Sequence, residues 1–165
     1  SAHVFFKAKL DGKPAPTTCK ISRIGGPKES YSANIVRLCE ASDIAILKPI
    51  FGDNPVNTPT LNIAKNLSFH PGYRVYVCGF PDPVPGRRSI TFFQSRVTEE
   101  YVRTTKTRYS IDQNIQSGMS GGPVLNGQMT VVGVILEGVN ADGNGRNSFV
   151  SARHILGLIE EIKSA

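Results

Sequence analysis

The chain has 165 residues, of which 39% are hydrophobic and 19% charged, and it carries a formal net charge of +6. A chain of this length can bury a substantial core, and no apolar run approaches the about 18 residues that a membrane-spanning helix needs. The composition therefore predicts a globular chain without a membrane span.

Short strand-like runs, separated by turn signals, recur along the chain and predict an all-β fold. In chain order these runs cover residues 31–38, 43–47, 73–78, 90–97, 124–125 and 130–138. Glycine-rich breakers separate them, and Asn126-Gly127 predicts a two-residue type I′ hairpin turn.

Only the end of the chain has a helical pattern. Apolar residues recur there at helical spacing after Ser151, which is suited to the N-cap position. They are Ile155, Leu158, Ile159 and Ile162. We expect a helix that packs against the last strands, with His154 in a structural role.

Basic residues and cysteines carry weaker signals. The lysines and arginines are scattered, and the densest stretches, Arg87-Arg88 and 103–108, look like exposed hairpin ends or linkers. We therefore expect a solvated surface and no nucleic-acid binding, which requires a contiguous basic stripe.

The three cysteines cannot all pair internally, so free thiols are expected. No Cys/His cluster has the spacing of a metal site, and we expect neither metal nor cofactor.

Asp43 opens the apolar run Ile44 to Leu47, which has the composition of a buried strand. An unpaired charge that enters a core is costly, so such an aspartate usually has a specific hydrogen-bonding role. Orienting an imidazole is one such role. A turn or strand-edge residue is the alternative interpretation.

Residues 118–123, Gly-Met-Ser-Gly-Gly-Pro, place Ser120 between glycines. A serine hydroxyl becomes a good nucleophile when a neighbouring base takes its proton, and the developing oxyanion needs backbone N–H groups aimed at it. Gly118 can adopt a positive φ and turn its amide inward beside that of Ser120. A glycine-rich hairpin with a surface serine is the competing interpretation.

A serine nucleophile of this type needs a histidine, and the chain has three. His70 precedes a proline in a polar loop, and His154 lies in the predicted helix. Only His3, in Ser-Ala-His-Val, is flanked by small residues. His3 is therefore the candidate base.

Taken in order, the strings Ser-Ala-His-Val, Ser-Asp-Ile-Ala-Ile-Leu-Lys and Ser-Gly-Met-Ser-Gly-Gly-Pro-Val resemble the chymotrypsin-like serine peptidases. The resemblance is to the branch that includes HtrA/Deg peptidases, glutamyl endopeptidases and viral polyprotein proteases. Residues 72–81 are similar to the family's strand that ends in Gly-aromatic-Pro, and Asp112 matches a frequent aspartate upstream of the serine. The similarity covers nearly the whole chain.

The resemblance implies one peptidase domain with a chymotrypsin-like fold of two Greek-key β-barrels and a C-terminal helix. Residues 1–52 would form the first barrel, 53–60 the linker, and 61–165 the second barrel with the helix. Family members place about two strands before the histidine, and here only two residues precede it. The first barrel is incomplete as written, and we expect an upstream N-terminal segment to be required.

The resemblance also implies a serine endopeptidase that hydrolyses peptide bonds of a polypeptide substrate through an acyl-enzyme. His3 would be the general base and then the general acid, Asp43 would orient the imidazolium, and Ser120 would be the nucleophile. The backbone amides of Gly118 and Ser120 would form the oxyanion hole. Met119 replaces the aspartate that receives a new amino terminus in animal trypsins, so we expect other contacts to hold this loop.

The pocket for the side chain before the cut would be lined, by the same resemblance, by Asn114, Ile115, Leu136, Glu137, Gly138 and, as a further candidate, Asn147. None of these residues is well suited to select a charged substrate side chain, which predicts a neutral or aliphatic residue before the cut. The edge 136–138 should pair with an extended peptide as an added strand.

Two other functions remain open. A catalytically inactive relative would be a binding module, which the short start and Met119 beside the serine make credible. A nucleic-acid-binding β-barrel would bind with a steep salt dependence. Acylation of Ser120 by a fluorophosphonate distinguishes the enzyme from both.

Overall fold

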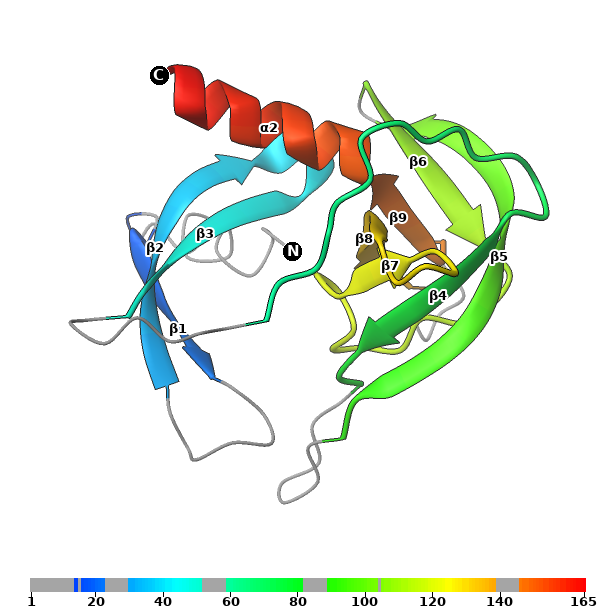
Figure 1. Cartoon of the computed structure of the whole chain (residues 1–165), viewed down its shortest axis with the longest axis horizontal. Coiled ribbons are helices and arrows are strands. Elements are labelled where there is room, and N and C mark those ends of the chain that lie inside the picture. The colour runs from blue at the N-terminus through cyan, green and yellow to red at the C-terminus, as the bar shows by residue number, and fades with distance from the viewer. Residues whose placement is uncertain are drawn as a thin grey trace.

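The computed structural model describes residue 14 and residues 16–22, 30–51, 59–81, 89–103, 105–138 and 146–165. Within these ranges strands dominate, and they form two units joined by a single long helix (Figure 1). The prediction of an all-β chain with a terminal helix is confirmed.

The first unit is an antiparallel sheet of three strands in the order β1-β2-β3. Its strands are β1 (Thr18–Ser22), β2 (Ser30–Cys39) and β3 (Ile44–Ile50). A short 3₁₀ helix, η1 (Glu40–Ser42), connects β2 to β3. This sheet positions the residue that follows η1, Asp43.

The second unit is a closed antiparallel barrel in the order β4-β5-β6-β9-β8-β7. Its strands are β4 (Arg74–Gly79), β5 (Thr91–Arg103), β6 (Lys106–Ile111), β7 (Pro123–Leu125), β8 (Val131–Glu137) and β9 (Ser148–Ser151). Apolar side chains fill it, including Val75, Val77, Ile135 and Phe149, none of which is measurably exposed. The Phe69 ring packs edge-on against Phe149, with 5.3 Å between ring centroids.

Helix α2 (Ala152–Ser164) begins beside the barrel and runs along the three-stranded sheet (Figure 1). The Ser151 hydroxyl accepts a hydrogen bond from the Arg153 N–H at 3.2 Å, so the predicted N-cap is confirmed. Ile155 and Leu158 of the helix pack with Ile44 of β3 and Leu136 of β8 in one buried cluster. This cluster joins the two units.

The hairpin at Asn126-Gly127 differs from its prediction. Neither residue has the positive φ that a type I′ turn requires, and the left-handed residue is Met129, at φ 58°. The Asn126 side chain instead accepts hydrogen bonds from the N–H groups of Gln128 and Thr130, each at 3.0 Å. That capping role fixes Asn126 as the first residue of a longer turn.

Several other sequence predictions can be placed in the structure. Most of the expected linker 53–60 lies outside the described residues. Cys19, Cys39 and Cys78 are all free thiols. In the described part of the chain, no helix has the length and apolarity to cross a bilayer, and no group of three or more His, Cys, Asp or Glu could hold a metal ion.

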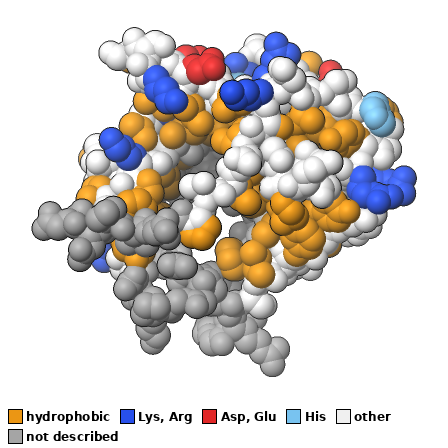
Figure 2. All heavy atoms as spheres, in the orientation of Figure 1, with side chains coloured by type: hydrophobic (Ala, Val, Ile, Leu, Met, Phe, Trp, Pro, Cys, Tyr) orange, Lys and Arg blue, Asp and Glu red, His pale blue; other side chains and the backbone are white. Residues whose placement is uncertain are grey.

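On the face seen in Figure 2, several basic side chains lie near the upper edge and the others lie apart, without a continuous stripe across the face. The expectation of a solvated basic surface agrees with this view. One residue corrects it, because Arg108 is only 7% exposed. A strand of the closed barrel, β6, carries Arg108, so the stretch 103–108 is more than an exposed hairpin end.

Candidate active site

Ser120 is the second residue of the second of two consecutive tight turns, which share Met119. The Met119 N–H donates to the Gln116 carbonyl at 3.2 Å, and the Gly122 N–H donates to the Met119 carbonyl at 3.0 Å. The third residue of each turn is a glycine with positive φ, Gly118 at 87° and Gly121 at 90°. This is the pattern of type II turns, which favour glycine at that position. The glycines flanking the serine therefore define the shape of the loop.

The loop is fixed on one side by the end of β4. Met119 is 1% exposed and packs in the barrel core. A Cβ on Gly79 would lie 3.1 Å from the Met119 Cα, and a Cβ on Gly122 would lie 2.1 Å from the Cys78 carbonyl oxygen. These close approaches are possible only because both positions are glycine.

On the other side the loop is bonded to β8. The Gly121 N–H donates to the Ile135 carbonyl at 2.8 Å, and the Ile135 N–H donates to the Gly122 carbonyl at 2.9 Å. Burial of Met119 and these backbone hydrogen bonds hold the loop in its shape. They do so without an acidic side chain at position 119. The expectation that contacts other than an ion pair support the loop agrees with this arrangement.

Asp43 caps the C-terminal end of η1. It is partly buried and has left-handed backbone angles, φ 57° and ψ 38°, and its N–H donates to the Glu40 carbonyl at 3.2 Å. Aspartate tolerates this region better than most residues. Strand β3 starts at the next residue, Ile44, as the sequence predicts, but only Ile44 is fully buried and the other positions are half-buried or exposed.

The surroundings of Asp43 and Ser120 meet at β8. Ile44, directly after Asp43, is buried in one cluster with Leu136. Ile135, the preceding residue, bonds to the backbone directly after Ser120. Two segments far apart in the sequence are therefore attached to adjacent residues of one strand. His3, the expected base, lies outside the described residues.

Two of the candidate specificity residues, Ile115 and Gly138, lie in direct contact. A Cβ on Gly138 would be 2.2 Å from the Ile115 carbonyl oxygen. Asn147 ties the same segment down, because its Oδ1 accepts from the Ile115 N–H at 2.8 Å and its Nδ2 donates to Asn114 Oδ1 at 3.1 Å. Ile115 and Leu136 have buried side chains, so the surface they offer is mainly backbone.

Glu137, another candidate specificity residue, is bound by two arginines. Arg103 donates to its Oε1 at 2.6 Å and Arg108 at 3.1 Å. Sequence reasoning missed this cluster, since the partners are 34 and 29 residues away from Glu137. Because Glu137 is already engaged, it is not a free carboxylate for a basic substrate side chain.

Asp112 supports the segment leading to the serine. Its Oδ1 accepts from the Ser95 hydroxyl at 2.7 Å and from the Arg96 N–H at 2.9 Å. These hydrogen bonds, that of Ser95 first, hold the pKa of the carboxyl below its usual value. Asp112 therefore has a structural role in tying the chain after β6 to β5.

A family model described as a trypsin-like peptidase domain matches residues 1–134. Among solved structures, the MamO protease domain from Magnetospirillum magneticum superposes with a TM-score of 0.65 at 18% sequence identity, over 86% of this chain and 74% of that chain. The Rv3671c protease from M. tuberculosis, in its active form, gives a TM-score of 0.64 at 23% identity, over 83% and 61%.

The serine endoprotease from Yersinia pestis superposes with a TM-score of 0.68 at 19% identity, over 91% of this chain and 50% of that chain. At these identities the likeness is one of fold. The chymotrypsin-like fold expected from the sequence is thereby confirmed.

Proposed function

The chain belongs to the trypsin-like peptidase family, and we propose that it is a serine endopeptidase that uses His3, Asp43 and Ser120. The observation that carries the proposal is the pair of type II turns around Ser120. Ser120 is partly buried and lies on a backbone held by these turns, and a fixed position of this kind is what attack on a peptide carbonyl requires.

The first turn also supports an oxyanion hole. A type II turn differs from a type I turn by a flip of its central peptide bond, so the positive φ of Gly118 sets the direction of the Gly118 N–H. We assign this N–H and that of Ser120 to the developing oxyanion. Such donors stabilise the transition state because they need no reorganisation during the reaction.

In the proposed reaction, Ser120 Oγ attacks the substrate carbonyl carbon while His3 takes the hydroxyl proton. His3 then returns that proton to the leaving amine, and water hydrolyses the acyl-enzyme by the same steps. Asp43 would hold the imidazole in its productive orientation and stabilise the imidazolium. Its support from η1 and from the buried start of β3 suits a positioning role.

The specificity we propose is for a small uncharged side chain before the cut. The walls expected to flank that side chain, at Ile115 and Gly138, are in contact, and the Asn147 amide bonds to both Ile115 and Asn114. We infer that these contacts leave little room for a long or charged side chain. Substrate backbone would pair along 136–138 as an added strand.

A fluorescent fluorophosphonate tests the assignment of the nucleophile. We expect the wild type to be labelled, Ser120→Ala and His3→Ala to be unlabelled, and Asp43→Asn to react more slowly by about four orders of magnitude. Ser164→Ala removes an exposed hydroxyl at the end of α2 and serves as the matched control, with full labelling. Failure of the folded wild type to react would favour a catalytically inactive binding module.

A further inference from the structure

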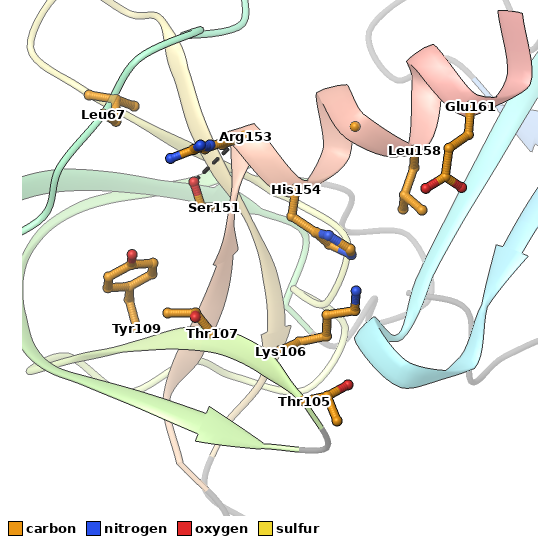
Figure 3. A pocket seen from close by; sticks show the side chains of 11 residues that line it. Leu67, Thr105, Lys106, Thr107, Tyr109, Ser151, Arg153, His154, Leu158 and Glu161 are labelled. Atoms are coloured by element: carbon orange, nitrogen blue, oxygen red, sulfur yellow. Dashed lines mark hydrogen bonds between the residues drawn. The ribbon is translucent and has the colours of Figure 1, made fainter. Parts of the chain in front are cut away.

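A pocket of about 450 Å³ opens between the start of α2 and strand β6, and none of its lining residues belongs to the Ser120 loop. Figure 3 shows its walls, with Lys106 and the threonines beside it on one side and the first turns of α2 on the other. This volume lies in the range of sites for small organic ligands.

Unpaired positive charge gathers at this pocket. Lys106 and Arg153 both line it, and neither forms an ion pair with any of the described residues. Glu161 lies at the same pocket, but its carboxylate bonds to Arg37 at 3.1 Å. Burial, and then the negative charge of Glu100, raise the pKa of Tyr109, which also lines the pocket.

The helix adds to this positive potential. The N-terminal end of a helix carries a partial positive charge, which acidic residues in the first turn usually offset. The first turn of α2 has no acidic residue and contains Arg153 and His154 instead. The fixed positive charge of Arg153 at the positive end of a helix is unfavourable unless an anion lies close by.

His154 provides an unsatisfied polar atom at the same place. Its Nε2 is buried and has no hydrogen-bond partner. Lys106 extends from β6 toward the His154 ring (Figure 3). Burial, and then the charge of Lys106, lower the pKa of His154, while Glu161 acts in the opposite direction. An unpartnered buried ring nitrogen is costly, and an oxyanion oxygen would accept a hydrogen bond from it in the tautomer that carries the proton on Nε2.

We propose that this pocket binds a small molecule through a doubly charged oxyanion such as a phosphate, held by Lys106, Arg153, His154 and the first turn of α2. Lys106, Arg153 and His154 line one pocket beside a helix N-terminus, which favours a dianion over a singly charged carboxylate. The site is distinct from the proposed peptidase centre and requires no catalysis.

Thermal unfolding in inorganic phosphate, sulfate, acetate and chloride at equal ionic strength and pH tests the proposal. We expect phosphate to raise Tm saturably, because a ligand that binds only the folded state stabilises it by mass action. Lys106→Ala and Arg153→Ala should each weaken the apparent affinity for phosphate about 10-fold or more. Lys163→Ala removes a lysine from the last turn of α2 and should leave the response unchanged.

Phosphate and sulfate also stabilise proteins by exclusion from their surface. The difference in Tm response between the wild type and the variants therefore tests whether phosphate binds at this pocket. The NMR titration of the His154 ring gives a second readout. Bound phosphate should raise the pKa of His154 in the wild type, and Lys106→Ala should raise it even without phosphate.

Identical Tm responses in the wild type and in Arg153→Ala, whose side chain is exposed, would overturn the proposal, as would a His154 pKa that phosphate leaves unchanged. An equal saturable effect of acetate would contradict the assignment of a dianion. None of these measurements depends on labelling of Ser120, so the two proposals can fail separately.

Discussion

Single residues with restricted backbone angles define the candidate active site. Gly118 and Gly121 adopt left-handed angles on either side of Ser120, and Asp43 adopts them at the end of η1. The sequence predicted the serine loop because few residue types suit such turns. It could not predict the arginines that hold Glu137, since that contact depends on how the barrel closes.

Gly118→Ala should separate loop shape from overall stability. A left-handed alanine costs about 1–2 kcal/mol, which a flip of the turn peptide would relieve. The flip removes one oxyanion donor, so the fluorophosphonate labelling rate should fall about 10²- to 10³-fold. The comparison is with Gly127→Ala, at a glycine with open space around it and no positive φ, which should label normally. Equal rates for the two variants would contradict the role given to Gly118.

Asp112→Asn should alter the pH dependence of stability. The folded-state pKa of Asp112 is depressed, so its contribution is present above the unfolded pKa and is lost as the pH falls through the folded value. The variant should lose about 1 kcal/mol at pH 7, a small value because the group is exposed, and little at strongly acidic pH. Urea unfolding of the wild type and the variant at pH 7 and at strongly acidic pH measures the difference in stability. A stability difference that does not change with pH would argue against the ionised carboxylate as the source.

At the scale of elements, strands with clear apolar runs were predictable and polar ones were not. The run 31–38 falls within β2, and the runs 73–78 and 90–97 overlap β4 and β5 but start one residue before them. Strands β1, β6 and β9 were missed, because they are short and rich in polar residues. In β6 the buried positions include Arg108 and Ser110, so the alternation of polar and apolar residues that marks a half-buried strand is absent.

The contact between the end of β8 and the segment before Ser120 predicts a preference among substrates. Peptides with alanine before the cut should be cleaved at least about 10-fold faster, in kcat/KM, than those with phenylalanine or lysine. Asn147→Ala, which releases the Ile115 N–H, should reduce that difference. A faster reaction with phenylalanine or lysine would show that the space for this side chain opens wider than the Gly138 contact allows.

At the scale of the molecule, one apolar cluster holds the three-stranded sheet against the barrel. Ile44 is the fully buried residue that the sheet supplies, with Cys39 and Ile46 packed beside it, and Leu136, Val150, Ile155 and Leu158 come from β8, β9 and α2. This contact relates the segment carrying Asp43 to the loop carrying Ser120. The sequence predicted that the two residues belong to one site through family resemblance, whereas the contact itself depends on residues distant in the chain.

Ile44→Ala should therefore weaken both stability and reactivity. Ile44 is 4% exposed, and its truncation should cost about 2–5 kcal/mol and slow labelling of Ser120 as Asp43 loses its support. Ile50→Ala, on the same strand but 46% exposed, should change stability by at most about 0.5 kcal/mol. Denaturant unfolding and fluorophosphonate labelling of both variants check this prediction. Equal behaviour of the two variants would rule out Ile44 as the contact that joins the units.

The most direct test of a serine peptidase centre is mass spectrometry of the folded chain after reaction with a fluorophosphonate. The account predicts one adduct per chain, located by fragmentation on Ser120, and no adduct after denaturation before reaction. An unmodified folded chain, or an adduct on another serine, would contradict it.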